Sequence, residues 1–261
     1  MRILITNDDG ISAPGLITLQ SIAARLADRP EDVWTVAPAF EQSGVGHCIS
    51  YSKPLMVQHL ADRHIACEGS PADCVLAGVH EFMRDTPPDL ILSGVNRGNN
   101  SAENALYSGT LGAAIEGALQ GITSIGLSQF YGPRNRDLAD PFEAARDHGE
   151  HVIRRILATL ESQGDGYKLF FNVNFPPVPS AEVSGIRVVS QGLRPGTGFH
   201  TEAAQTPNGR KFLWIKGGNQ QVATAPDTDA DVNLDGYISV TPMRADLTDH
   251  AALRDLQGIA T

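Results

Sequence analysis

Short runs of apolar residues recur along the first two thirds of the chain, separated by longer segments with apolar positions three or four residues apart. An unbroken apolar run is typical of a strand that is buried on both faces of a parallel sheet. The runs predict strands at residues 3–5, 33–36, 90–92, 122–127 and 168–175. Pro38 closes the second of these strands, and Pro176 with Pro177 ends the last.

The segments between the runs have the spacing of amphipathic helices. Pro14 stands at the first position of one helix, whose inward face carries Leu16, Leu19, Ala23 and Leu26. Further helices are predicted from Ser70 and Pro71 onward, with Val75, Leu76, Val79 and Phe82 or Met83 inward, over 109–119, where Gly121 stops the helix, and over about Asp140 to Glu161. Strands that alternate with helices in this way predict a doubly wound α/β fold with a largely parallel sheet.

The last third of the chain has a different pattern, rich in Gly, Pro, Asn and Thr. Asn208 and Gly209 precede an apolar run at 211–215, and Asn-Gly before such a run is a hairpin signal. We therefore expect an α/β core over residues 1–190, and a C-terminal extension over 191–261 that carries an antiparallel hairpin arm.

The hairpin arm also contains apolar residues that look exposed. They lie between about Arg194 and Asp246 and are Phe199, Phe212, Leu213 and Trp214. Because a two-stranded hairpin is marginally stable alone in water, we expect these side chains to contact the core or another subunit.

Composition and charge exclude several classes of protein. The 261 residues have a formal net charge of -10 and no block of Lys or Arg, which argues against a nucleic-acid groove. No apolar stretch is long enough to span a membrane, and the N-terminus shows a strand pattern rather than a signal peptide. Cys48, Cys67 and Cys74 have neither disulfide-framework nor zinc-site spacing, so a cytoplasmic location is expected.

Two adjacent acids, Asp8 and Asp9, end the first predicted strand, and Gly10 follows them. Neighbouring side chains on a strand point to opposite faces, so these acids can converge only where the backbone turns, which Gly10 permits. Convergent carboxylates repel unless a cation or shared proton lies between them, and a hard divalent cation is the simplest neutraliser. The alternative is a helix cap, but Ser12 before Pro14 already fits that role.

Two further polar clusters follow predicted strands. They are residues 41–44, which include Ser43, and residues 93–100, which include Asn96. Ligands of open α/β sheets bind outside the carboxyl ends of the strands, so all three clusters are expected on one rim. Their carboxylate, hydroxyl and amide oxygens suit magnesium or manganese.

A fourth cluster, residues 107–114, is predicted to turn into a helix. The N–H groups and dipole at a helix N-terminus can hold phosphate without a cationic side chain, and Ser108 and Thr110 add hydroxyl donors beside Gly109. The simpler interpretation, a capped and tightly packed helix, is compatible with this one.

Together these motifs resemble the survival protein SurE family. The resemblance is carried by residues 7–10 with 13–15, 37–44, 93–98 and 107–110, and it extends to 69–74, 172–176 and 236–242. Two positions depart from the family pattern: Ala39-Phe40 replaces an acidic-basic pair, and Asn104 replaces an Asp.

The resemblance implies a metal-dependent 5′-nucleotidase that hydrolyses nucleoside 5′-monophosphates. The implied metal ligands are Asp8, Asp9, Ser43 and Asn96, with one divalent cation, Mg²⁺ or Mn²⁺, in each subunit. The implied fold is a three-layer, Rossmann-like α/β/α core, and the implied assembly is a cytoplasmic homodimer or homotetramer formed through the C-terminal extension.

Other chemistries have weaker support. A non-catalytic nucleotide-binding regulator could use the same rim, and only turnover separates it from an enzyme. An aspartyl-phosphate route usually carries D-x-D, whereas Asp8 and Asp9 are adjacent. Gly44-Val45-Gly46 lacks the third glycine of a dinucleotide fingerprint, and residues 231–242 lack the closing Glu of a calcium loop. His47 is expected to make a loop hydrogen bond.

Overall fold

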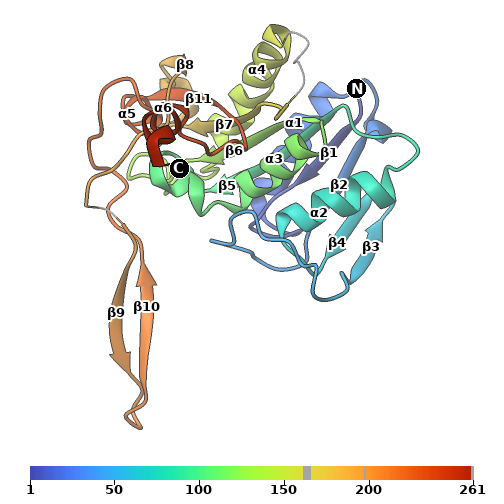
Figure 1. Cartoon of the computed structure of the whole chain (residues 1–261). Helices are drawn as coiled ribbons and strands as arrows, with labels where there is room; N and C mark the ends of the chain where they lie inside the picture. The colour runs from blue at the N-terminus through green and yellow to red at the C-terminus, as the bar shows by residue number, and fades with distance from the viewer. Residues whose placement is uncertain (161–165, 197, 260–261) are drawn as a thin grey trace.

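The fold is described by a computed structural model, which covers residues 1–160, 166–196 and 198–259. In this part of the chain, nine strands form one sheet in the order β3-β4-β2-β1-β5-β6-β7-β11-β8 (Figure 1). Their bounds are β1 Ile3–Thr6, β2 Val33–Pro38, β3 Val57–Ala61, β4 His64–Cys67, β5 Leu90–Arg97, β6 Thr123–Gln129, β7 Phe170–Phe175, β8 Gly185–Val188 and β11 Tyr237–Met243.

The sheet is largely parallel, as predicted. Strands β4, β2, β1, β5, β6 and β7 run parallel to one another, whereas β3 is antiparallel to β4 and β11 is antiparallel to β7. Strand β8 then pairs in parallel with β11 at the far edge. Strand β11, close to the C-terminal end of the described chain, therefore belongs to the main sheet.

Helices cover both faces of the sheet, so the predicted α/β/α layering is confirmed (Figure 1). Helices α1 and α4 pack on one face, and α2 and α3 pack on the other. The helix bounds are α1 Pro14–Leu26, α2 Pro71–Ala77, α3 Gly109–Leu119, α4 Glu143–Thr159, α5 Asp229–Leu234 and α6 His250–Asp255. No helix in the described residues is both long and apolar enough to cross a membrane.

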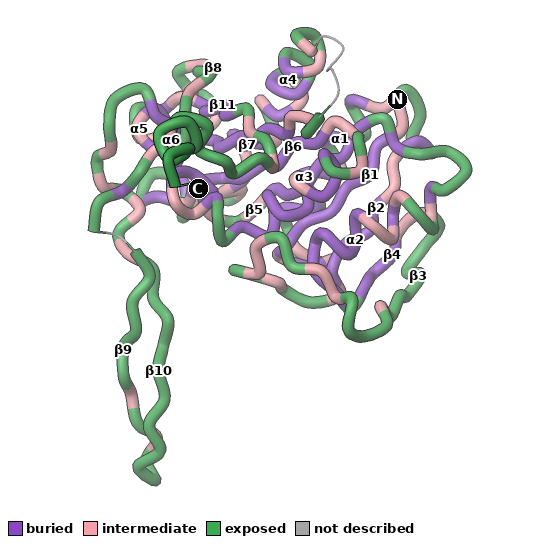
Figure 2. The backbone as a smooth tube through the Cα atoms, viewed as in Figure 1, coloured by how far each residue is buried: buried purple, intermediate pink, exposed green. Residues whose placement is uncertain are grey.

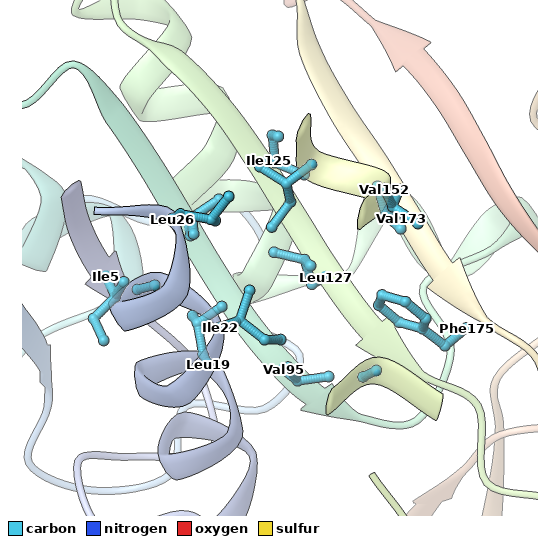
Figure 3. Close-up of a cluster of buried hydrophobic side chains, with 14 of the residues drawn as sticks. Ile5, Leu19, Ile22, Leu26, Val95, Ile125, Leu127, Val152, Val173 and Phe175 are labelled. Atoms are coloured by element: carbon cyan, nitrogen blue, oxygen red, sulfur yellow. The ribbon is translucent and has the colours of Figure 1, made fainter. Parts of the chain in front are cut away.

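The two apolar layers follow from the alternation of side chains along each strand. On β1, Ile3 and Ile5 face the α1–α4 side, and Leu4 between them faces the α2–α3 side. Figure 3 shows the first layer, in which Leu19 and Ile22 of α1 lie close to strand residues such as Val95 and Leu127. Figure 2 shows the buried residues concentrated in the central strands and the inner faces of these helices.

The predicted hairpin is also present. Strands β9 (His200–Gln205) and β10 (Lys211–Lys216) pair in antiparallel register and project away from the sheet (Figure 1). Every residue of β10 is exposed, and Figure 2 shows most of the arm exposed. The predicted boundary after residue 190 remains a proposal, since β11 returns to the main sheet after the arm.

Some predicted boundaries were wrong. Ser12 does not cap α1: Ala13 is the residue before the helix, in an extended conformation that Pro14 favours, and it provides no side-chain cap. Strand β5 does not end at Leu92 but continues to Arg97, because β6 keeps pairing with it beyond an irregularity between Ser93 and Asn96.

Two predicted helices also differ in extent. The helix from Pro71 becomes a π-helix over Gly78–Phe82 rather than continuing as one α-helix. Helix α4 begins at Glu143, three residues after the predicted start, and Glu161 at its predicted end lies outside the described residues.

Candidate metal and phosphate site

A pocket of about 270 Å³ lies at the carboxyl ends of β1, β2 and β5. It is lined by all four predicted metal ligands, Asp8, Asp9, Ser43 and Asn96, and by Ser108 from the predicted phosphate cradle. The sheet order explains this convergence, since β1 lies between β2 and β5 and the three strands are parallel. The fold thus brings together side chains that are up to 100 residues apart in the sequence.

Asp8 is the most buried acid of the pocket. The Thr110 hydroxyl donates a hydrogen bond of 2.6 Å to Asp8 Oδ1. Burial raises the pKa of the Asp8 carboxyl from 3.8 to about 6; the Thr110 hydrogen bond opposes this rise and the charge of Asp9 adds to it. A nearby cation would stabilise the charged form of this buried carboxyl and so lower its pKa.

Asp9 is less buried and points to the same rim. Its Oδ2 accepts a hydrogen bond of 2.9 Å from the backbone N–H of Arg97 at the end of β5. Burial raises the pKa of the Asp9 carboxyl, the Arg97 contacts lower it, and the charge of Glu41 raises it further. Both adjacent acids therefore carry a raised pKa, and each has a neutral hydrogen-bond donor fixing one oxygen.

Ser43, in the loop after β2, and Asn96, near the end of β5, complete the predicted ligand set. The Ser43 hydroxyl donates to Glu41 at 2.7 Å, and Asn96 Nδ2 donates to the Gly98 carbonyl at 2.9 Å. Because Nδ2 makes this contact, Oδ1 is the Asn96 atom that would bind a cation. A backbone bond of 2.7 Å from Gln42 N–H to the Asp8 carbonyl ties the Ser43 loop to β1.

Helix α3 packs against the loop that carries Ser43. His47 Nε2 lies 2.7 Å from Glu116 Oε2, and this hydrogen bond holds the pKa of the Glu116 carboxyl below its ordinary value. His47 therefore does make a hydrogen bond from the loop, as predicted. The backbone of Gly46 approaches Gly112 so closely that a Cβ on Gly112 would lie 2.2 Å from the Gly46 carbonyl oxygen.

The substitution Gly112→Ala should therefore push the Ser43 loop away from α3. We expect about 1–3 kcal/mol lower stability from overpacking and about tenfold weaker metal binding from the displaced ligand. Urea unfolding and Mn²⁺ calorimetry measure the two effects, with the exposed Leu119→Ala on the same helix as control. Unchanged metal affinity in Gly112→Ala would show that the loop position does not matter.

The predicted phosphate cradle is only partly directed at the pocket. Ser108 lines the pocket and caps α3, because its Oγ accepts a hydrogen bond of 3.1 Å from the Leu111 N–H. Gly109 lies against Asp8, so that a Cβ there would be 3.0 Å from the Asp8 Cβ. Thr110 is fully buried and its hydroxyl is directed at Asp8. Sequence reasoning missed this contact, which joins residues 102 positions apart.

The contact between Thr110 and Asp8 changes the expected effect of Thr110→Ala. Removing the hydroxyl should raise the Asp8 pKa further and weaken metal binding about 10- to 100-fold, as for other groups that orient a ligand. Thr110→Ser keeps the hydroxyl and should bind metal nearly as the wild type does. Mn²⁺ titration at several pH values tests this. If Thr110→Ala loses substrate use and keeps metal affinity, Thr110 contacts phosphate instead.

Several further pocket residues were not among the predicted site residues. Phe199, Gly217 and Gln220 come from the two ends of the β9–β10 arm, and Tyr107 and Asn104 come from the segment before α3. Asn104 is one of the two departures from the family pattern, and its Nδ2 donates a hydrogen bond of 2.6 Å to Gln220 Oε1.

The donor set is made of oxygen atoms and contains few acids. In the described residues, no group of three or more His, Cys, Asp and Glu side chains could hold a metal. A cation here would thus depend on Asp8, Asp9 and the neutral oxygens of Ser43 and Asn96. That donor set suits a hard divalent cation such as Mg²⁺ or Mn²⁺ and not a soft metal that prefers thiolates.

The chain is similar to known proteins over its full length. Residues 3–197 match the family model described as "Survival protein SurE". A protein of Roseobacter denitrificans named 5′-nucleotidase SurE is 65% identical over the full length of both chains. A protein of the same name from Ruegeria pomeroyi is 66% identical over 98% of this chain and 99% of its own length.

A solved structure agrees with these sequence relatives. The crystal structure of the SurE protein from Aquifex aeolicus covers 100% of both chains with a TM-score of 0.81 and 31% sequence identity. A family model over most of the chain, close relatives over its full length and a matching fold lead to the same conclusion: this chain belongs to the SurE family.

Proposed function

We propose that this chain is a 5′-nucleotidase, an enzyme that hydrolyses nucleoside 5′-monophosphates to nucleoside and phosphate. The observation that carries the proposal is the convergence of Asp8, Asp9, Ser43 and Asn96 with Ser108 in one pocket. Its full-length relatives at 65% and 66% identity are named 5′-nucleotidases, which supports the same activity.

The residues of the pocket fit a divalent cation. Two carboxylates with raised pKa values, a hydroxyl and an amide oxygen face the same small volume. We assign Asp8, Asp9, Ser43 and Asn96 as the ligands of one Mg²⁺ or Mn²⁺ per subunit. When bound, such a cation supplies Lewis acidity, which lowers the pKa of water and polarises phosphoryl oxygens.

The protein itself would position the phosphate and the ligands. The start of α3 would hold phosphate oxygens through its dipole and the Ser108 hydroxyl, which matters in a chain whose net charge is -10. Thr110 orients the Asp8 carboxylate through its hydroxyl, and the Arg97 N–H orients Asp9. Gly109 belongs to the proposed cradle through its backbone, because it lies against Asp8 at the first turn of the helix.

A phosphate-release screen over nucleoside 5′-monophosphates tests the proposal. Assays with Mg²⁺, Mn²⁺ and a chelator should show turnover that needs metal. Retention of nucleotide without phosphate release would instead favour a non-catalytic nucleotide-binding regulator. Release that persists in the chelator would contradict the metal requirement and keep the nucleotidase assignment.

We also propose that the chain works as a homodimer or homotetramer in the cytoplasm. The β9–β10 arm exposes apolar side chains on both of its faces, which favours contact with another subunit. The three cysteines are free thiols, Cys48 exposed and Cys67 and Cys74 buried, and an exposed thiol is suited to a reducing compartment.

A further inference from the structure

The root of the hairpin arm forms one wall of the catalytic pocket. Phe199 precedes β9, and Gly217 and Gln220 follow β10, yet all three line the same pocket as Asp8 and Asn96. The lining combines charged side chains, the acids and Arg97, with uncharged aromatic and amide side chains. A nucleotide has a similar combination, with an anionic phosphate at one end and a flat, neutral base at the other.

The aromatic part of this wall consists of Tyr107 and Phe199. Their ring centroids are 4.9 Å apart at an interplanar angle of 75°, an edge-to-face contact. Tyr107 is 47% exposed and Phe199 is 50% exposed, so the protein covers only about half of each residue. Gly217 lies beside Phe199, since a Cβ on Gly217 would be 3.4 Å from the ring. The two rings thus hold each other in place and keep about half of their surface available for stacking.

Two amides lie in the same wall. Asn104 Nδ2 donates to Gln220 Oε1 at 2.6 Å, and Gln220 Nε2 donates to the Gly218 carbonyl at 3.2 Å. A carboxamide offers a donor and an acceptor side by side, which is the pattern that pairs with the edge of a base. Asn104 replaces the family's acid here, so this edge is neutral in this chain.

We propose that Tyr107 and Phe199 form the stacking platform for the nucleobase of the substrate and that Asn104 and Gln220 contact the edge of the base. The inference rests on the proposed nucleotidase function and assigns its base subsite. Because Phe199 and Gln220 belong to the arm, the arm contributes to substrate recognition as well as to assembly.

A second pocket of about 760 Å³ lies on the other side of Asp9. It contains the exposed aromatic ring of Phe40 together with Tyr131, but it shares only Asp9, Glu41 and Arg97 with the first pocket. It lacks Ser43, Asn96 and Ser108, so a base there would be separated from the phosphate end by Asp9 itself. The second pocket is therefore the competing location that the experiment must exclude.

The experiment compares two substrates that differ only in the base, adenosine 5′-monophosphate and ribose 5-phosphate. Phe199→Ala should lower kcat/KM for the nucleotide about tenfold, mainly through KM, since an aromatic stacking partner contributes about that much to base binding. The same variant should leave ribose 5-phosphate hydrolysis unchanged. Gln220→Ala should act in the same direction with a smaller effect.

Two control variants remove exposed aromatic rings outside the proposed base subsite. Phe40→Ala removes an exposed ring from the second pocket, and Tyr167→Ala removes one that is 56% exposed just before β7, at the amino end of the sheet. Neither should change the ratio of the two kcat/KM values. Light scattering of each variant checks that the assembly is intact.

Equal losses on both substrates in Phe199→Ala would overturn the inference, because they would indicate a structural role. A nucleotide-specific loss in Phe40→Ala would also overturn it and place the base in the second pocket. Calorimetry with adenosine, which carries the base and no phosphate, gives a second readout: wild type should bind it more tightly than Phe199→Ala. Release of phosphate from neither substrate would instead refute the nucleotidase proposal, and the base subsite with it.

Discussion

Asp8→Asn or Asp9→Asn should lower metal-dependent phosphate release about a thousandfold while leaving the fold intact. Each change removes a carboxylate that we assign as a metal ligand, and a catalytic cation contributes several kcal/mol of transition-state stabilisation. Both residues lie on the rim of the sheet rather than in its apolar layers. Asn96→Ala removes a neutral ligand and should have a smaller effect on metal affinity.

Asp8→Asn should also make the metal-free protein more stable. Burial raises the Asp8 pKa from 3.8 to about 6, so the folded state holds the proton more tightly than the unfolded chain does. The metal-free fold therefore loses stability as pH rises from about 4 to about 6 and stays at the lower value above that range. Because each pKa unit corresponds to ~1.4 kcal/mol, Asp8→Asn should gain up to about 3 kcal/mol at pH 7.

Urea unfolding, with a chelator and with excess Mn²⁺, measures the stability of the wild type and of Asp8→Asn without and with metal. Metal should stabilise the wild type and have little effect on Asp8→Asn. The exposed Asp85→Asn serves as a control that changes the same net charge away from the site. Near-normal turnover of both Asp variants in limiting metal would rule out the assigned ligands.

The central part of the fold could be predicted because its strands are buried on both faces. Residues 3–5 and 90–92 are unbroken apolar runs, and β1 and β5 are neighbours in the sheet. Once parallel strands are recognised, their carboxyl ends share one rim, so the sequence alone was enough to place Asp8, Ser43 and Asn96 together. The motif order of the family strengthened that prediction.

The edges of the sheet could not be predicted in the same way. Strand β3 at Val57–Ala61 is exposed along its whole length, so burial imposes no pattern on its sequence. Strand β8 is half exposed and only four residues long. Such strands are defined by pairing with a neighbour, which periodicity does not reveal.

The pocket wall from the arm depends on contacts between distant segments. The buried Arg194 before the arm donates to the Ser101 carbonyl, and Asp229 after the arm accepts from the N–H groups of Ala102 and Gly192. These bonds fix both ends of the arm beside the loop that follows β5. A sequence pattern can predict the hairpin, but contacts between distant segments such as these place Phe199 and Gln220 in the pocket.

The exposed apolar surface of the arm leads to the last expected result. On β10, Leu213 is 56% exposed and Trp214 is 57% exposed, and consecutive strand residues face opposite sides. Both sides of the hairpin thus expose apolar area. A single contact with the chain's own core could cover only one of these sides. A symmetric homo-oligomer in which subunits exchange arms covers both sides.

The double substitution Leu213→Lys and Trp214→Lys should therefore dissociate the oligomer. Burying one large apolar side chain contributes about 1.5–3 kcal/mol, so losing two should weaken association at least about a hundredfold. Light scattering at micromolar concentration should show a smaller species, and Mn²⁺ binding should persist because no assigned ligand lies on the arm. Thr201→Lys with Gln205→Lys adds the same charge to exposed polar positions of β9 and should leave the assembly unchanged. A wild-type chain that is monomeric at that concentration would contradict the exchange of arms and leave the nucleotidase proposal standing.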